Sequence, residues 1–185
     1  EAVRKREGIS ENALVIGHVG RFNEQKNHEG LLKAFSIIVK RYPNCCLKLI
    51  GDGSLQEKIV ACAEELGIRN KVSFLGSQSN VYPFLREADL FLLPSKFEGM
   101  PMTIIEAMGT GLPIVASAVG GVPDMLEDGK SGILVSCEPA EIADAVCQLL
   151  DSETLRKKLG SNARLSSKQF SAEYMAQCYC NAYTR

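Results

Sequence analysis

Six short apolar segments divide this chain, and each is followed by a turn that contains glycine, proline or asparagine, or by residues with helical periodicity. The segments are apolar along nearly their whole length, which is typical of strands that are buried on both faces of a parallel sheet. Strands that alternate with helices in this way predict an α/β fold with a doubly wound parallel sheet of about six strands and helices on both faces. The expected strands are residues 14–19, 47–50, 72–75, 90–93, 113–116 and 132–135.

The helices are predicted from apolar residues that recur every three or four positions. In the segment 27–40, for example, Leu31, Phe35 and Ile38 recur at this spacing. No internal repeat or linker interrupts the pattern, so residues 1–185 are expected to form a single domain. The other expected helices are 55–66, 81–87, 101–108 and 122–126, together with a helical C-terminal third.

The charge of the chain is balanced, because 21 Lys and Arg residues stand against 22 Asp and Glu residues. The basic residues are spread along the chain, and this argues against nucleic-acid binding, which needs a basic patch. No apolar run approaches the ~20 residues of a membrane-spanning helix, and the start, Glu1 to Lys5, lacks the apolar core of a signal peptide. We therefore expect a cytoplasmic protein.

The seven cysteines include no C-x-x-C pair, so neither a disulfide framework nor a zinc site is expected. Small buried hydrophobic residues in a reducing compartment are the simpler interpretation for most of them. The chain also starts without a methionine, which suggests that it was cut from a longer protein.

Two carboxylates lie where a ligand of this fold is expected. In an open α/β sheet, ligands bind outside the carboxyl ends of the strands. Glu98 is in the loop after the expected strand 90–93, and Glu106 lies inside the helix that follows. Carboxylates accept hydrogen bonds from hydroxyl groups, so each could hold a hydroxylated part of a ligand. Taken alone, two solvated glutamates at this spacing explain the pattern as well.

The start of the helix between these two acids is a candidate anion site. Pro101 suits a first helical turn because it has no N–H that would lack a partner there. The free amides of Met102 and Thr103 lie at the positive end of the helix dipole, where a phosphate binds well. A ligand with a phosphate between two hydroxylated groups fits this order, and a nucleotide sugar has that layout.

Basic residues follow the first strand at the same edge of the sheet. Gly20 and Arg21 follow the end of the strand, and Lys26 lies in the same loop. A guanidinium group and an ammonium group together could neutralise a diphosphate. An ordinary solvated loop is the alternative interpretation of these residues.

Several motifs in a fixed order then carry a family resemblance. The chain is similar to the C-terminal, donor-binding domain of retaining glycosyltransferases of family 4, and the similarity covers residues 12–180. It implies the GT-B architecture, in which two Rossmann-like domains face each other across a cleft, so that the N-terminal acceptor domain is absent from this chain. The motifs are G-H-V-G-R-F-N-E-Q-K-N-H (17–28), L-I-G-D-G (49–53), F-L-G (74–76), D-L-F-L-L-P-S (89–95), E-G-M-P-M-T-I-I-E-A-M (98–108) and G-L-P-I-V-A-S (111–117).

The resemblance implies roles for individual residues. Arg21 and Lys26 match the pair that binds the diphosphate, and Glu98 matches the acid that contacts the donor sugar; these three are the expected catalytic residues. Glu106 matches the acid that holds the ribose. The other expected substrate-binding residues are Gly20, Gly76, Gln78, Gly99, Met100, Met102 and Thr103, of which Gly76 and Gln78 belong to the loop that holds the base. Pro101 stands where many members of the family have glycine.

The implied reaction is retaining transfer of a hexose from a nucleotide-diphosphate sugar, most simply a UDP-sugar, to a polysaccharide or lipid-linked acceptor. Family members do not depend on a D-x-D metal site, and this sequence has no such motif. We expect no cofactor, a full-length protein that is cytoplasmic or peripheral at the inner membrane face, and a fragment that binds donor but transfers poorly. The resemblance includes bacterial exopolysaccharide and capsule glycosyltransferases.

Alternatives from other classes are half of a nucleotide-sugar epimerase of the same architecture and a non-catalytic nucleotide-binding module. A dehydrogenase is disfavoured because G-x-x-G at 17–20 is not the G-x-G-x-x-G fingerprint. His18 lies inside an apolar strand and is expected in the core, whereas His28 opens a helix and is expected nearer the cleft. The pair Gly120-Gly121 fits either a close backbone approach to a ligand or a simple turn.

Overall fold

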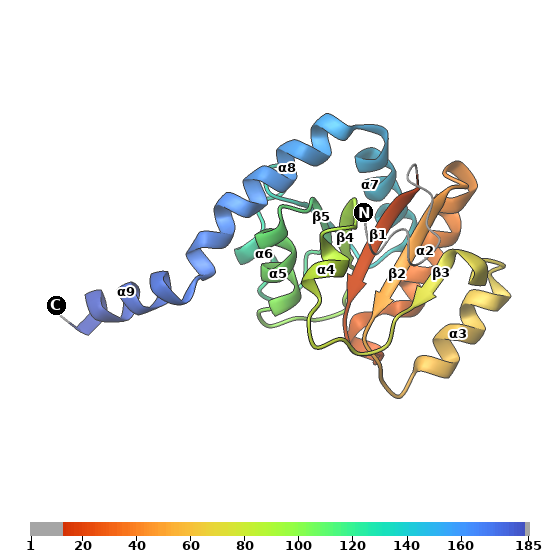
Figure 1. Cartoon of the computed structure of the whole chain (residues 1–185), viewed down its shortest axis with the longest axis horizontal. Coiled ribbons are helices and arrows are strands. Elements are labelled where there is room, and N and C mark those ends of the chain that lie inside the picture. The colour runs from red at the N-terminus through yellow and green to blue at the C-terminus, as the bar shows by residue number, and fades with distance from the viewer. Residues whose placement is uncertain (1–12, 184–185) are drawn as a thin grey trace.

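The computed structural model describes residues 13–183 and shows a six-stranded sheet in which every neighbouring pair of strands is parallel (Figure 1). The strand order is β3-β2-β1-β4-β5-β6, so β1 and β4 are neighbours although two strands separate them along the chain. This is the doubly wound order, with its switch point between β1 and β4. The strands are β1 (Leu14–Val19), β2 (Cys45–Ile50), β3 (Val72–Phe74), β4 (Leu90–Leu93), β5 (Ile114–Ser117) and β6 (Ile133–Val135).

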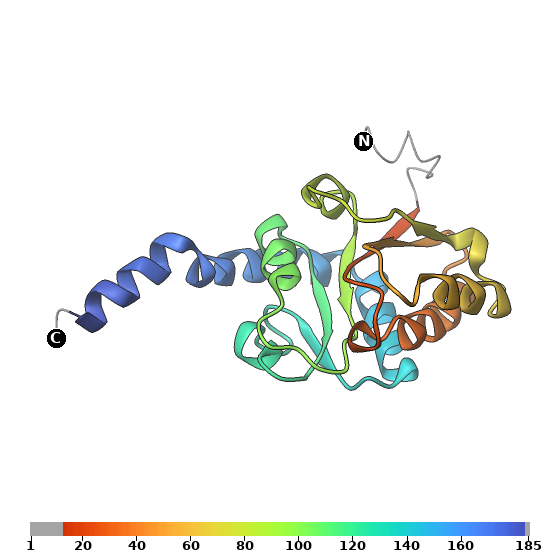
Figure 2. The same cartoon turned by 90° about the horizontal axis from the view of Figure 1, so that it is seen from below.

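Helices cover both faces of the sheet, as Figure 2 shows for α2 and α7 on one side and α4 and α5 on the other. The helices are α2 (His28–Arg41), α3 (Gln56–Glu65), α4 (Tyr82–Leu85), α5 (Met102–Thr110), α6 (Val122–Met125), α7 (Pro139–Asp151), α8 (Glu153–Ser166) and α9 (Ala172–Tyr183). Three short 3₁₀ turns join them, namely η1 (Glu24–Lys26), η2 (Arg69–Lys71) and η3 (Ser167–Phe170). The predicted fold class is therefore confirmed.

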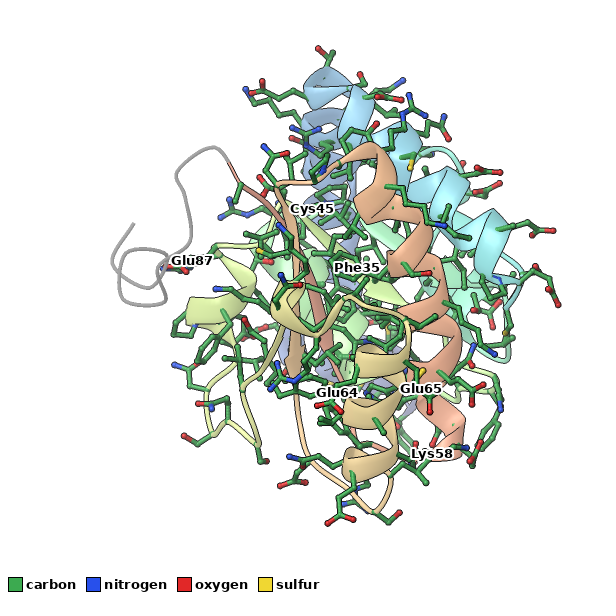
Figure 3. The ribbon with its side chains drawn as sticks, turned by 90° about the vertical axis from the view of Figure 1, so that its right-hand side faces the viewer. Phe35, Cys45, Lys58, Glu64, Glu65 and Glu87 are labelled. Atoms are coloured by element: carbon green, nitrogen blue, oxygen red, sulfur yellow. The ribbon has the colours of Figure 1, made fainter. Side chains whose placement is uncertain are left out.

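The sheet separates two apolar cores. Successive residues of a strand point to opposite faces, so Ile16 packs into the core under α2, α3 and α7, while Val15 packs into the core under α4, α5 and α6. Figure 3 shows Phe35 between α2 and the sheet, where its side chain is completely buried, whereas Lys58 lies on the exposed surface of α3. Because both faces are covered, the strands are mostly apolar, which is the pattern that the sequence shows. The polar exceptions are His18, Lys48, Ser73 and Ser117.

All six predicted strands are present, with small differences at their ends. β2 begins at Cys45, two residues before its predicted start, because Cys45 and Cys46 pair in parallel register with Leu14 and Val15. Cys45 is completely buried, and burial raises the pKa of its thiol to about 12. This cysteine therefore behaves as a small hydrophobic residue. The expectation that most cysteines are buried was wrong, because only Cys45 and Cys147 are buried, and the others are partly or fully exposed.

The C-terminal helix α9 leads away from the body of the domain, as Figure 1 shows. Every residue of α9 is exposed, including Cys178 and Cys180. Among the described residues, no helix is both long enough and apolar enough to cross a membrane. Glu1 to Lys5, where we expected no apolar core of a signal peptide, lie outside the described residues.

Candidate functional site

The loops after β1 and β4 lie against each other at the carboxyl edge of the sheet, because these two strands are neighbours. The backbone N–H of Lys96 donates to the carbonyl oxygen of Gln25 over 2.8 Å. The side-chain amide of Asn27 donates to the carbonyl oxygen of Pro94 over 3.0 Å. The switch point of the sheet thus places η1 directly beside the loop that leads to α5.

An ion pair joins these two loops. The Lys26 ammonium nitrogen lies 2.6 Å from Glu98 Oε1, and the two side chains are 13% and 5% exposed. Sequence analysis predicted both residues for the site, one for a diphosphate and one for a sugar, but it did not predict that they contact each other. The pair brings a positive and a negative group to one point at the edge of the sheet, 72 residues apart in the chain.

Gln25 is a further residue of this cluster, and sequence analysis missed it. Its side-chain nitrogen donates to Glu98 Oε2 over 3.2 Å and to the carbonyl oxygen of Phe97 over 3.0 Å. Its place next to Lys26 in one short turn was the only available signal, because nothing in the sequence shows which residues of a loop face a neighbouring strand.

Two asparagines give the loop after β1 its shape. The side chain of Asn23 accepts a hydrogen bond from the backbone N–H of Lys26, which caps η1. Asn27 adopts a left-handed conformation with φ 52° and caps α2 through the N–H of Gly30. Asparagine tolerates this backbone region better than most residues and also supplies the capping oxygen. The sharp turn at Asn27 ends η1 and starts α2, so Lys26 is held at the edge of the sheet.

Gly120 and Gly121 support the backbone of the Glu98 loop. A Cβ atom on Gly120 would lie 1.7 Å from the carbonyl oxygen of Glu98, and one on Gly121 would lie 2.2 Å from that of Gly99. The N–H of Gly121 also donates to the Glu98 carbonyl oxygen over 3.3 Å. The two glycines therefore do permit a close approach, but the backbone that approaches them is that of residues 98–99.

The helix α5 begins one residue later than predicted, at Met102, with Pro101 as its N-cap in an extended conformation. Its first turn still presents the amides of Met102 and Thr103, which precede the first intrahelical donors. The Thr103 hydroxyl oxygen is buried and has no hydrogen-bond partner within residues 13–183. The positive end of this nine-residue helix lies immediately after the loop that carries Glu98.

Glu106 lies just over one turn into α5 and is partly buried. Burial raises the pKa of its carboxyl above the ordinary value of 4.5. Within the described part of the chain, its carboxylate takes part in no hydrogen bond or ion pair. A partly desolvated carboxylate of this kind is ready to accept hydrogen bonds from a ligand.

A second part of the candidate site is a cavity of about 220 Å³ beside the ends of β1 and β2. Arg21, predicted in the loop after β1, and Gln78, predicted in the loop that the resemblance assigns to the base, both line it together with Gly20. Arg21 is exposed. Gln78 is tethered by its side-chain amide to the carbonyl oxygen of Leu75 over 2.6 Å. The cavity is further lined by Val19, Ile50, Gly51, Asp52, Ser77 and Val81.

The glycines of the neighbouring loops allow these loops to pack closely together beside this cavity. Gly51 has φ 133°, and a Cβ atom there would lie 2.1 Å from the carbonyl oxygen of Gly20. Its N–H donates to the carbonyl oxygen of Gly76 over 2.8 Å, which ties the loops after β2 and β3 together. The predicted residues Gly20 and Gly76 thus act through their backbones.

Two predicted residues have side chains away from the ion pair. Met100 and Met102 are 61% and 63% exposed, and they line an apolar groove of about 570 Å³ that α9 helps to form. Exposed Tyr174 and Tyr179 of α9 line the same groove. Only the backbones of the two methionines are therefore placed to serve the start of α5.

The two histidines are both buried behind the β1 loop. The Nδ1–H of His18 donates to the carbonyl oxygen of Leu92 over 2.8 Å, and the place of His18 in the core was predicted. His28 is 2% exposed and packs against Phe22, so the expectation that it lies nearer the cleft was wrong. Burial lowers the pKa of His18 to about 4 and that of His28 to about 2, so both rings are neutral at pH 7.

In the described residues, no group of three or more His, Cys, Asp or Glu side chains could hold a metal ion.

Comparison with known proteins gives concordant results. Residues 1–166 match the family model described as glycosyl transferases group 1. The N-acetyl-alpha-D-glucosaminyl L-malate synthase of Bacillus anthracis is 35% identical over 98% of this chain and 48% of its own length. A lipopolysaccharide core biosynthesis glycosyltransferase of Rhizobium meliloti is 31% identical over 94% of this chain and 50% of its own length.

Among solved structures, Anabaena HepE in complex with UDP superposes with a TM-score of 0.91 at 26% identity. The alignment covers 99% of this chain and 51% of the HepE chain. HepE has also been solved with UDP-glucose, where the TM-score is 0.90. The chain therefore spans about half the length of the curated and solved relatives that it matches.

Proposed function

Since this chain belongs to the group 1 glycosyl transferases, whose GT-B architecture it shares as a C-terminal domain, we propose that it is the donor-binding part of a retaining enzyme that uses a UDP-sugar. In the proposal, residues 1–185 form a single domain, and a separate N-terminal domain of the full protein binds the acceptor. The fragment alone binds donor but transfers poorly or not at all, because half of the cleft is missing.

The observation that carries this proposal is the Lys26–Glu98 pair at the switch point, immediately before the N-terminus of α5. A buried carboxylate and a largely buried ammonium group at a ligand-binding edge suit a ligand that uses both signs of charge. A sugar diphosphate does so, because its hydroxyls donate to carboxylates and its phosphates accept from cations and helix amides.

Different residues of the site bind different parts of the UDP-sugar. Arg21, Lys26 and the amides of Met102 and Thr103 stabilise the negative charge that grows on the leaving diphosphate. Glu98 accepts hydrogen bonds from the sugar, with the backbones of Gly99 and Met100 beside it.

The nucleoside occupies the other side. Glu106 holds the ribose, and the cavity beside Gly20 and Gln78 receives the base. The UDP and UDP-glucose bound in HepE support uracil as the base and a hexose as the sugar.

In the proposed reaction, an acceptor oxygen attacks the anomeric carbon from the face that the diphosphate leaves. The bond from the anomeric carbon to the UDP oxygen breaks with its electron pair staying on UDP, and the acceptor proton goes to that oxygen. The configuration is retained. No cofactor or metal is part of the proposal.

The acceptor is proposed to be a polysaccharide or a lipid-linked glycan, which the relative named for lipopolysaccharide core biosynthesis supports. A full protein that acts on such an acceptor would be cytoplasmic or peripheral at the inner face of the membrane.

Titration calorimetry on the chain tests the proposal directly. We expect UDP and UDP-glucose to bind, and GDP, ADP and NAD to bind more weakly. Preferential binding of NAD, or no binding of any uridine nucleotide, would contradict it. Transfer assays with the full-length protein, compared with conversion of the UDP-sugar in the absence of acceptor, separate a transferase from an epimerase.

A further inference from the structure

The two oxygens of the Glu98 carboxylate have different partners. Oε1 receives the Lys26 ammonium over 2.6 Å, and Oε2 receives the side-chain amide of Gln25 over 3.2 Å. The Glu98 side chain is only 5% exposed, so water does little to hold it in place. The orientation of this carboxylate therefore depends on one cation and one amide.

The cation cannot serve as a constant support if it also binds the donor. In the proposed function, Lys26 interacts with the diphosphate, and this weakens its hold on Glu98. A buried carboxylate that loses its partner is strongly destabilised unless other hydrogen bonds remain. The amide of Gln25 is neutral, so a phosphate attracts it less than it attracts the Lys26 ammonium group, and we expect the amide to remain on Glu98 when Lys26 moves.

Gln25 is itself fixed to the loop that it supports. A side-chain amide nitrogen has two N–H donors, and these reach two acceptors of one loop, Glu98 Oε2 and the Phe97 carbonyl oxygen at 3.0 Å. The backbone carbonyl oxygen of Gln25 in turn accepts from the N–H of Lys96 over 2.8 Å. Two hydrogen bonds of the side-chain amide thus set its direction, and the backbone bond to Lys96 holds Gln25 beside the same loop.

We propose that Gln25 is a positioning residue for Glu98, which it holds in the orientation that meets the donor sugar while Lys26 binds the diphosphate. This inference rests on the proposed function, because it takes the sugar as the partner of Glu98. It goes further in assigning the orientation of the carboxylate to a residue that itself contacts no part of the donor.

The test compares Gln25→Met with wild type by titration calorimetry of the chain with UDP and UDP-glucose. Methionine keeps the length of the side chain and removes both donors. We expect the gain in affinity from UDP to UDP-glucose to fall about tenfold, the equivalent of one hydrogen bond to a charged group. The affinity for UDP itself falls less. Gln56→Met, which changes an exposed glutamine at the start of α3, is the matched control and leaves both affinities unchanged.

A second arm separates positioning from a general effect on the fold. In a Glu98→Gln background, Gln25→Met is expected to cause no further loss of the sugar-dependent gain, because the carboxylate that it orients is gone. An equal loss in both backgrounds would overturn the inference, and so would an undiminished gain in Gln25→Met. Those outcomes leave the proposed function intact, whereas a wild-type chain that binds neither UDP nor UDP-glucose overturns both.

Discussion

Gly120 offers a sharp test of how closely the candidate site is packed. Gly120 has φ 52°, and a Cβ atom there would lie 1.7 Å from the Glu98 carbonyl oxygen, well inside the 3.0 Å that real Cβ contacts keep. Gly120→Ala must therefore push the Glu98 loop and the 118–121 turn apart by more than about 1 Å. Displacements of about 1 Å at a reacting centre can reduce turnover by about 100-fold.

Gly67 supplies the matched control for this substitution. It has φ 67°, close to that of Gly120, but no atom lies within 4 Å of a Cβ built on it. Gly67→Ala should cost only the left-handed backbone strain, about 1–2 kcal/mol of unfolding free energy. Gly120→Ala should cost about 1–3 kcal/mol more from overpacking.

Chemical denaturation measures the difference in stability between the two variants, and calorimetry with UDP and UDP-glucose measures the difference in donor affinity. We expect Gly120→Ala to lose most of the affinity gained from the sugar and Gly67→Ala to keep it. If the two variants were equally stable and bound UDP-glucose equally well, the contact between Gly120 and the Glu98 loop would have no role in holding the site.

Three further predictions follow from charges and burial. Arg21→Ala and Lys26→Ala should each weaken UDP binding by about 1.5–3 kcal/mol, the range for hydrogen bonds to charged groups, and calorimetry that showed unchanged affinity in both would remove them from the site. Glu106→Gln should weaken UDP and UDP-glucose binding alike. Because burial raises the pKa of this carboxyl, its ionised form at pH 7 destabilises the folded state, and the variant should unfold at a higher temperature than wild type at that pH. A lower unfolding temperature would contradict the reasoning. His18 and His28 have folded pKa values of about 4 and about 2 against 6.5 unfolded, so stability is full above pH 6.5 and falls as the pH drops below it. His28→Phe should reduce the loss of unfolding free energy between pH 7 and pH 5 by about 2 kcal/mol, measured by denaturation at both values, and an unchanged loss would count against a neutral buried His28.

The sequence was sufficient to predict the fold because each strand is apolar on both faces. Ile16 faces one core and its neighbour Val15 faces the other, so consecutive apolar residues indicate a strand that is buried on both faces. The ends of the helices and strands were predicted less accurately. Cys45 and Pro101 show why: the start of β2 depends on pairing with β1, and Pro101 fits the cap of α5 as well as its first turn.

The members of the site were predicted better than their contacts. Lys26 and Glu98 were found from charge and position, but their direct pairing depends on β1 and β4 being neighbours, which the order along the chain does not show. Gln25 was missed for the same reason. The burial of His28 could not be foreseen either, because it depends on the left-handed turn at Asn27 that directs α2 onto the sheet.

The long separation between the two halves of the ion pair has a consequence for folding kinetics. Lys26 and Glu98 are 72 residues apart, whereas β1, β2 and β3 pair in sequential order. Closing so long a loop loses chain entropy before any contact rewards it, and contacts of high sequence separation form slowly. The β1–β2–β3 unit can therefore assemble before β4 joins β1, and only that later step brings the two charges together. A chain stalled between these steps would hold three of its six strands but no donor site, so we expect binding competence to be a late event in the folding of this domain.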